Sequence, residues 1–179
     1  MGEAENDSLD SFDEFVRARS TALTRTAYLL TTDRHAAEDL VQEVLERLYV
    51  RWRRIHSEPE AYARRILANR AIDRWRLRAR RPEVSLTRDT EAAVADHAER
   101  VTVRESVLTA LRDLPARQRV AVVLRYLDDL PEAEVARVMG CSAGAVKSHT
   151  SRGMARLRHV LAGSFETTER TTGRTGGPR

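Results

Sequence analysis

The sequence predicts an all-α protein made of two small helical domains joined by a flexible linker. Apolar residues recur at helical spacing over residues 11–82 and again over residues 103–162. No stretch alternates apolar and polar residues as a half-buried strand does, and no hairpin dipeptide separates two apolar runs. Capping and breaking residues stand where the periodic segments begin and end. With 179 residues, the chain suits one ordinary domain or two small ones.

Three helices are expected in the N-terminal half. Residues 1–10 are acidic and are expected to form a disordered leader. Ser11 opens the motif "SFDE", a capping box that would start the first helix. Asp33 is the expected N-cap of a second helix, whose apolar and polar residues fall on opposite faces. Ser57 opens a second capping box, "SEPE", which would start the third helix.

The C-terminal half follows an expected linker. Residues 83–102 contain five acids, two arginines and few large apolar groups. Two amphipathic segments come next within residues 103–162, and a proline-started helix then stops at Gly140. Ser142 is placed to cap a last helix. Residues 163–179 are rich in glycine, threonine and arginine and are expected to be a disordered tail.

Composition excludes several classes of function. No apolar run approaches the roughly 18 residues of a membrane span, and the acidic N-terminus lacks the features of a signal peptide, so we expect a cytoplasmic protein. Cys141 is the only cysteine, which rules out an internal disulfide and favours a packing role. The five histidines are scattered, and no phosphate-binding loop or hydrolase motif is present. We therefore expect neither an enzyme nor a cofactor.

Residues 51–81 form a strongly basic segment. They contain eleven arginines against three acids, a local net charge of +8, and Trp52, Tyr62 and Trp75 lie among the arginines. Arginines neutralise phosphates and aromatic faces accept unstacked bases, which favours nucleic-acid binding. The alternative is a solvated helix with Trp75 in the core.

A helix-turn-helix pattern spans residues 131–157. Gly140 would supply the turn, with the small Ala136 four residues before it, and Val135, Met139, Cys141 and Val146 fall where such a unit buries its own core. The outward residues of the second helix are Lys147, Ser148, Ser151 and Arg152. Short polar side chains with a few cations suit a helix in the DNA major groove. The alternative is a helical hairpin without a DNA role.

A polar face is expected on the helix after Asp33. Its members are Asp39, Gln42, Glu43 and Glu46. Such a face is either solvated surface or a contact for a partner rich in arginine or lysine.

Taken together, these segments resemble an extracytoplasmic-function (group IV) RNA polymerase sigma factor, most closely the SigE-type group of high-GC bacteria. "AEDLVQEVLERLY" resembles region 2.2, "EAYARRILANRAIDRWRLRARR" resembles regions 2.3 and 2.4, and "LPEAEVARVMGCSAGAVKSHTSRGMARLR" resembles region 4.2. The similarity covers residues 11–162, so residues 11–82 would be region 2 and residues 103–162 region 4. It departs from common relatives at Thr150 and Gly153, where leucine and alanine are usual.

The resemblance implies roles for these residues. Region 2 would dock on the β′ clamp helices of core RNA polymerase through Asp39, Leu40, Gln42, Glu43 and Glu46. It would also bind and melt the −10 element through Arg54, Arg65, Asn69, Arg70, Asp73, Arg74, Trp75, Arg76 and Arg80. Region 4 would contact the β flap and read the −35 element through Ser142, Lys147, Ser148, Ser151 and Arg152.

Two alternatives stay open from the sequence. "VKSHTSR" also resembles the recognition helix of LuxR-type regulators, although the helical, basic first half lacks the alternating pattern of a receiver domain. An RNA-processing enzyme would need a catalytic constellation that the sequence does not contain. Many sigma factors are held by an anti-sigma factor, which is a further possible partner.

Overall fold

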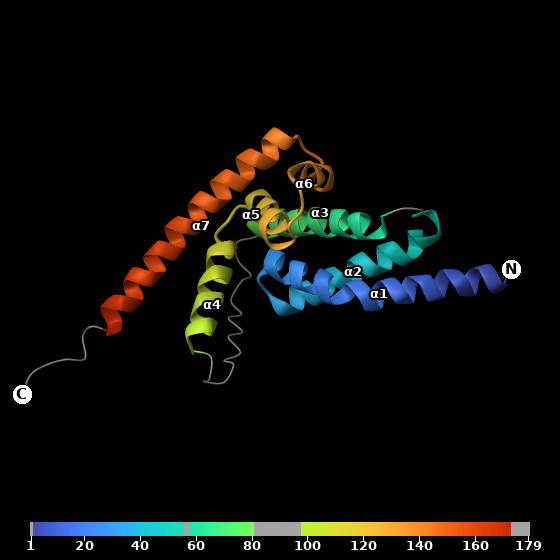
Figure 1. Ribbon diagram of the computed structural model, residues 1–179, viewed down its shortest axis with the longest axis horizontal. Helices are drawn as coiled ribbons and strands as arrows, with labels where there is room; N and C mark the ends of the chain where they lie inside the picture. The colour runs from blue at the N-terminus through green and yellow to red at the C-terminus, as the bar shows by residue number, and fades with distance from the viewer. Residues whose placement is uncertain (1, 56–57, 81–97, 173–179) are drawn as a thin grey trace, which may run out of the picture.

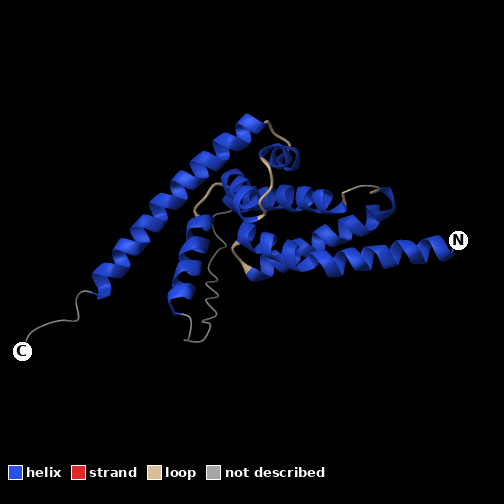
Figure 2. Ribbon diagram, in the orientation of Figure 1, coloured by secondary structure: helices blue, strands red, loops and turns tan. Residues whose placement is uncertain are grey.

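The computed structural model describes residues 2–55, 58–80 and 98–172, and all regular structure within these ranges is helical (Figures 1 and 2). The all-α prediction is confirmed. The elements in chain order are α1 (Gly2–Thr31), α2 (Arg34–Arg51), the 3-10 turn η1 (Trp52–Arg54), α3 (Pro59–Arg80), α4 (Ala98–Arg112), α5 (Ala116–Val122), the π-helical turn η2 (Val123–Leu127), α6 (Glu132–Met139) and α7 (Ala143–Thr172).

Helices α1, α2 and α3 pack together as the N-terminal half. Leu40, Val44 and Leu48 recur on one side of α2 and are fully buried, with Leu67 of α3 among them. The predicted cap of α2 is confirmed, because the Asp33 carboxylate accepts a 2.7 Å hydrogen bond from the Ala36 amide. Burial of this apolar stripe fixes the rotation of α2 and therefore decides which of its residues face outward.

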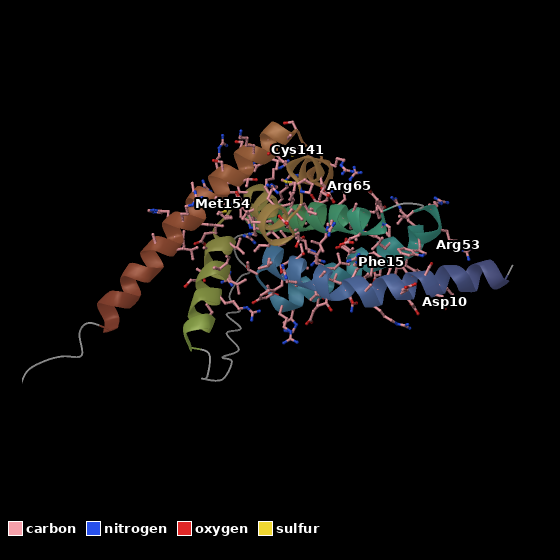
Figure 3. The ribbon with its side chains drawn as sticks, in the orientation of Figure 1. Asp10, Phe15, Arg53, Arg65, Cys141 and Met154 are labelled. Atoms are coloured by element: carbon pink, nitrogen blue, oxygen red, sulfur yellow. The ribbon has the colours of Figure 1, made fainter. Side chains whose placement is uncertain are left out.

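The start of α1 differs from the prediction. The helix begins at Gly2, so residues 2–10 are helical rather than a disordered leader, and Ser11 lies inside the helix instead of capping it. The Ser11 hydroxyl accepts a 2.9 Å hydrogen bond from the Trp52 indole, and the Phe12 ring meets that indole edge-on at 5.1 Å. Phe15, which Figure 3 labels on α1, also packs against Trp52, with ring centroids 5.2 Å apart. These contacts with a residue 41 positions away favour helix where the local capping signal predicted a boundary.

Two further boundaries differ, and one lies outside the described residues. Helix α4 begins at Ala98, so the last five residues of the expected linker are helical. Helix α7 continues to Thr172, ten residues beyond the predicted region 4, and projects from the body of the molecule (Figure 1). The predicted cap at Ser57 lies outside the described residues.

The C-terminal half contains the predicted helix-turn-helix. Gly140 ends α6 in the left-handed conformation at φ 60°, where a side chain would be strained. The Ser142 hydroxyl accepts a 3.2 Å hydrogen bond from the Ala145 amide at the start of α7. Val135 and Val146 are fully buried and Met139 nearly so. The turn, the cap and the burial of Val135, Met139 and Val146 are thus as predicted, whereas Cys141 is only half-buried.

Contacts between the two halves are the feature that the sequence left undecided. The Thr26 hydroxyl of α1 donates to the Asp128 carboxylate, with oxygen separations of 2.8 and 3.0 Å. The buried Arg119 guanidinium of α5 donates to the Leu30 carbonyl at the end of α1, at 2.8 Å. Helix α3 also packs against α5 and α6, and the buried residues of both halves form one connected cluster. The described chain is therefore closed, with its C-terminal half seated on its N-terminal half.

Within the described ranges, no helix is long and apolar enough to cross a membrane.

Candidate nucleic-acid interface

One face of α3 carries a row of exposed polar residues. Arg65, Asn69, Asp73 and Arg76 are all exposed and, at about 100° of rotation per residue, fall within one face of the helix. Figure 3 labels Arg65 on α3. Leu67, Ala68 and Ile72 are buried on the side that packs against the rest of the first half. The row, hereafter the α3 row, presents two guanidinium groups, an amide and a carboxylate to a ligand.

Arg70 and Arg74 do not belong to this row. The Arg70 guanidinium lies 2.9 Å and that of Arg74 3.2 Å from the Glu43 carboxylate of α2. Arg74 also donates to the Ala36 carbonyl at 3.2 Å. Each of these arginine side chains is about one third exposed. Packing of α3 on α2 therefore divides the predicted basic segment into an outward set and a set that holds two helices together.

The remaining predicted residues of this segment lie at its two ends. Arg54 is exposed in η1, before α3. Trp75 is 37% exposed near the C-terminal end of α3, so it is a surface residue and not the core residue of the alternative interpretation. The side chain of Arg80 lies outside the described residues.

The polar face of α2 is present, with one exception. Asp39, Gln42 and Glu46 are exposed, whereas Glu43 is half-buried by its arginine partners. Leu40 is fully buried, so its predicted contact with a partner is wrong. The apolar stripe that packs α2 against its neighbours includes Leu40, which therefore points away from the polar face.

Sequence reasoning missed the apolar end of this α2 face. Tyr49 is 54% and Val50 81% exposed, one turn beyond Glu46. Tyr49 and Val50 follow Asp39 by ten and eleven residues, a spacing that places them on the same side of α2 as the polar face. This spacing could have identified them from the sequence.

Helix α7 presents the predicted recognition residues. Lys147, Ser151 and Arg152 are exposed and Ser148 is half-buried, while Val146 anchors the same turn in the core. Of the residues that departed from common relatives, Thr150 donates to the Val146 carbonyl at 2.8 Å within α7.

His149 and Asp128 have perturbed pKa values. Burial lowers the pKa of His149, and the charges of Arg117 and Arg152 lower it further. His149 is therefore in a positive field beside the recognition residues. Burial raises the pKa of Asp128, although the Thr26 hydroxyl bond opposes this shift.

Side chains that could bind a metal ion do not converge in the described part of the chain. No three histidine, cysteine, aspartate or glutamate side chains there are grouped as metal ligands would be. Cys141 is half-buried and packs against the apolar core, in agreement with a packing role.

Comparisons with known proteins agree with the two-part organisation. The family described as Sigma-70 region 2 matches residues 15–81, and the family described as Sigma-70, region 4 matches residues 104–157. The chain is 38% identical over 152 residues to the RNA polymerase sigma-E factor of Streptomyces coelicolor, covering 84% of this chain and 85% of that protein. It is 32% identical over 167 residues to the ECF RNA polymerase sigma factor SigE of Mycolicibacterium smegmatis, covering 87% and 63% respectively.

A solved structure shares the fold. The sigma factor RpoE of Bartonella quintana, crystallised in complex with the anti-sigma factor NepR, matches with a TM-score of 0.66 and 24% identity. The match covers 85% of this chain and 97% of RpoE. At this identity the likeness concerns the fold alone.

Proposed function

The chain belongs to the extracytoplasmic-function sigma factors of RNA polymerase, and we propose which of its surfaces binds each promoter element and which binds the polymerase. It directs core RNA polymerase to promoters and acts there as an initiation factor, in a family whose members are not themselves enzymes. The family matches support this function and not the LuxR-type regulator that the motif "VKSHTSR" left open. Because it acts with RNA polymerase, we place it in the cytoplasm.

In this proposal residues 11–82 act as region 2 and residues 103–162 as region 4, joined by residues 83–102. The exposed end of α7 lies in the −35 major groove, where Lys147, Ser148, Ser151 and Arg152 contact the bases and the backbone, and Ser142 lies at its entry. The observation that carries this assignment is the buried anchor Val146 beneath an exposed surface of short polar and cationic side chains.

The α3 row is the proposed −10 surface. Arg65 and Arg76 attract the phosphates, and Asn69 and Asp73 offer an amide and a carboxylate to the edges of unpaired bases. Trp75 adds an exposed aromatic face on which an unstacked base could rest. Capture of unpaired bases offsets the free-energy cost of opening the duplex.

The exposed face of α2 is the proposed contact with the β′ clamp. It combines the charge of Asp39 and Glu46 with the apolar surface of Tyr49 and Val50. Glu43 is already bonded within the chain, so we assign it first to holding α3 on α2.

The closed arrangement must open before both promoter elements are bound. Elements centred about 25 base pairs apart are separated by roughly 85 Å along B-form DNA. Helix α3 is about 33 Å long, and α6 packs directly on it, with Arg64 and Glu134 at 3.6 Å. The two DNA-binding surfaces are thus too close to bind both elements at once, and we infer that region 4 leaves region 2 during assembly with polymerase.

Run-off transcription with purified core RNA polymerase tests the function. The chain should support initiation from a promoter that the core enzyme alone does not use. Arg152→Ala should weaken promoters that depend on the −35 element without changing the affinity for core polymerase. Glu46→Lys should lower that affinity instead. If Arg152→Ala abolished core binding, or if no genomic template were stimulated, the assignment would be refuted.

A protein inhibitor of this chain stays a prediction. RpoE was crystallised with an anti-sigma factor, but that likeness concerns the fold alone.

A further inference from the structure

The exposed side of α7 has small residues along its centre and cations along both edges. Ser148, Ser151 and Ala155 lie about opposite the buried Val146 and Leu157, at about 100° of rotation per residue. Ser151 and Ala155 are exposed, and Ser148 is half-buried. This narrow strip would let the helix sit deep in a groove.

A first row of cations lies along one edge of the strip. Arg152 and Arg156 of α7 are exposed there, and Arg117 of α5 is exposed as well. Arg117 directly precedes Gln118, whose backbone carbonyl lies against Gly153 of α7, and Gly153 follows Arg152. The charges of Arg117 and Arg152 both lower the pKa of His149. Arg117 therefore extends the basic edge of α7 although it comes from another helix.

Gly153 explains why α5 approaches α7 so closely. A Cβ atom at this position would lie 2.7 Å from Cγ2 of Val122 and 3.3 Å from the carbonyl oxygen of Gln118. A separation of 2.7 Å is inside van der Waals contact, so the present spacing of the two helices requires glycine. Arg117 directly precedes Gln118, and the close packing brings it beside the recognition turn.

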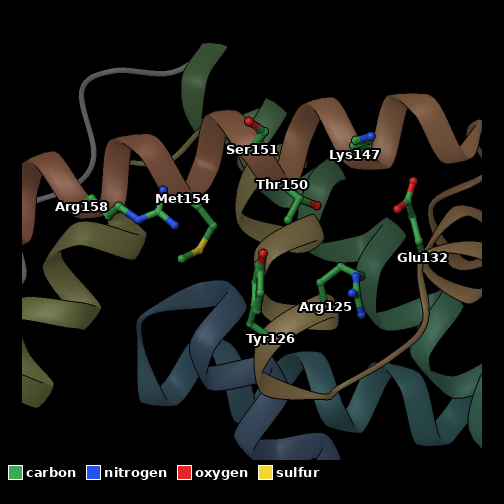
Figure 4. Close-up of a pocket in the computed structure, with 8 residues that line it drawn as sticks. All are labelled: Arg125, Tyr126, Glu132, Lys147, Thr150, Ser151, Met154 and Arg158. Carbon is green, nitrogen blue, oxygen red and sulfur yellow. The ribbon is translucent and has the colours of Figure 1, made fainter.

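A second row lies along the other edge. Lys147 and Arg158 of α7 are exposed along an open pocket of about 280 Å³ (Figure 4). Arg125 of η2 also lines this pocket, but it is half-buried and its guanidinium donates to the Leu130 carbonyl. Tyr126 lies in the same pocket, and Glu132 is the one acid among the residues that line it. This edge therefore carries a net positive charge.

We propose that the two rows bind phosphates on the two walls of the −35 major groove, one strand to each row. The inference rests on the proposed function, in which α7 lies in that groove. A helix with its side chains is about 10–12 Å across and the groove is about 12 Å wide, so cations at both edges of α7 reach opposite walls. Arg117, Arg156 and Arg158, which are all exposed, are thereby added to the predicted −35 surface. Gly153 becomes the residue that positions Arg117.

Salt dependence of promoter binding tests the proposal with the full chain assembled on core RNA polymerase. Arg117→Gln and Arg158→Gln should each reduce the slope of log affinity against log salt by about 0.9, which corresponds to roughly five-fold weaker binding near 0.15 M salt. Each loss should be the same on promoters with strong and weak −35 sequences, because phosphate contacts carry no base information. Arg117→Lys should retain the slope.

The matched control is Arg17→Gln, which removes an exposed arginine of α1 and should leave the slope unchanged. If Arg117→Gln and Arg158→Gln left the slope unchanged while Lys147→Ala and Arg152→Ala weakened binding, the two-row inference would be wrong and the proposed function would stand. If all four variants bound like the parent chain, the −35 assignment of α7 would itself fail. A loss that depended on the −35 sequence would refute phosphate binding in favour of base reading.

Discussion

The bond between Thr26 and Asp128 connects the two halves and gives a prediction that can be worked out in detail. Thr26 is 5% exposed, and its hydroxyl donates to both carboxylate oxygens of Asp128. Thr26→Val keeps the shape of the side chain and removes only the donor. A hydrogen bond to a charged acceptor contributes about 1.5–3 kcal/mol, and the partial exposure of Asp128 favours the lower end. We expect a loss of about 1.5 kcal/mol, or roughly 3–6 °C in Tm for a chain of this size.

The stability lost in Thr26→Val should depend on pH, and the direction of this dependence follows from the pKa of Asp128. Burial raises the pKa of Asp128 above its ordinary value of 3.8, while the Thr26 hydroxyl and the charges of Arg64 and Arg25 oppose the shift. Between 3.8 and the raised pKa the folded chain binds more protons than the unfolded chain, so stability falls as the pH rises through that window. Without the hydroxyl the pKa of Asp128 rises further. The variant should therefore be penalised most at neutral pH and least where Asp128 is protonated in both chains.

Urea unfolding followed by circular dichroism at a series of pH values measures this difference. Thr150→Val is the matched control, because the Thr150 hydroxyl donates to Val146 within its own helix and crosses no boundary between the halves. Its cost should be small and independent of pH. A penalty for Thr26→Val that did not shrink in acid, or one no larger than that of Thr150→Val, would refute the role assigned to this contact.

The remaining predictions concern packing and ion pairs. Gly153→Ala should destabilise the chain by about 1–3 kcal/mol in thermal unfolding, because the new methyl group would collide with α5. Gly144→Ala, in open space on the same helix, should be neutral or stabilising by up to about 1 kcal/mol, and the reverse order would contradict the packing argument. Gly140→Ala should cost about 1 kcal/mol, since φ there is 60°; an unchanged midpoint in urea would show that the turn tolerates a side chain. Glu43→Gln should cost about 1 kcal/mol through loss of the ion pairs with Arg70 and Arg74, and an unchanged midpoint would count against its bracing role.

Local signals predicted the local structure well. Asp33 and Ser142 cap the helices that follow them, and Gly140 adopts the left-handed conformation that the turn requires. Each of these features depends on a few neighbouring residues, so a single sequence contains the information. The prediction failed at Ser11, because aromatic packing against the distant Trp52 extends α1 through the expected boundary.

The candidate surfaces were predicted by residue type but not by orientation. The basic composition of residues 51–81 is a property of the sequence, yet packing against Glu43 decides that Arg70 and Arg74 turn inward while Arg65 and Arg76 face outward. Similarly, Leu40 was predicted to contact a partner, and the fold buries it completely on the apolar side of α2.

The sequence by itself determined that the chain is helical, that it has two parts and that the second part contains a helix-turn-helix, because periodicity, caps and turn residues act over short distances. Only the tertiary structure decided which cations are free to meet DNA, how closely α5 approaches α7 at Gly153, and that the two halves close on each other through Thr26 and Asp128. These outcomes depend on how helices rotate and pack against partners far away in the chain. That information is spread over many residues and is expressed only when the core forms.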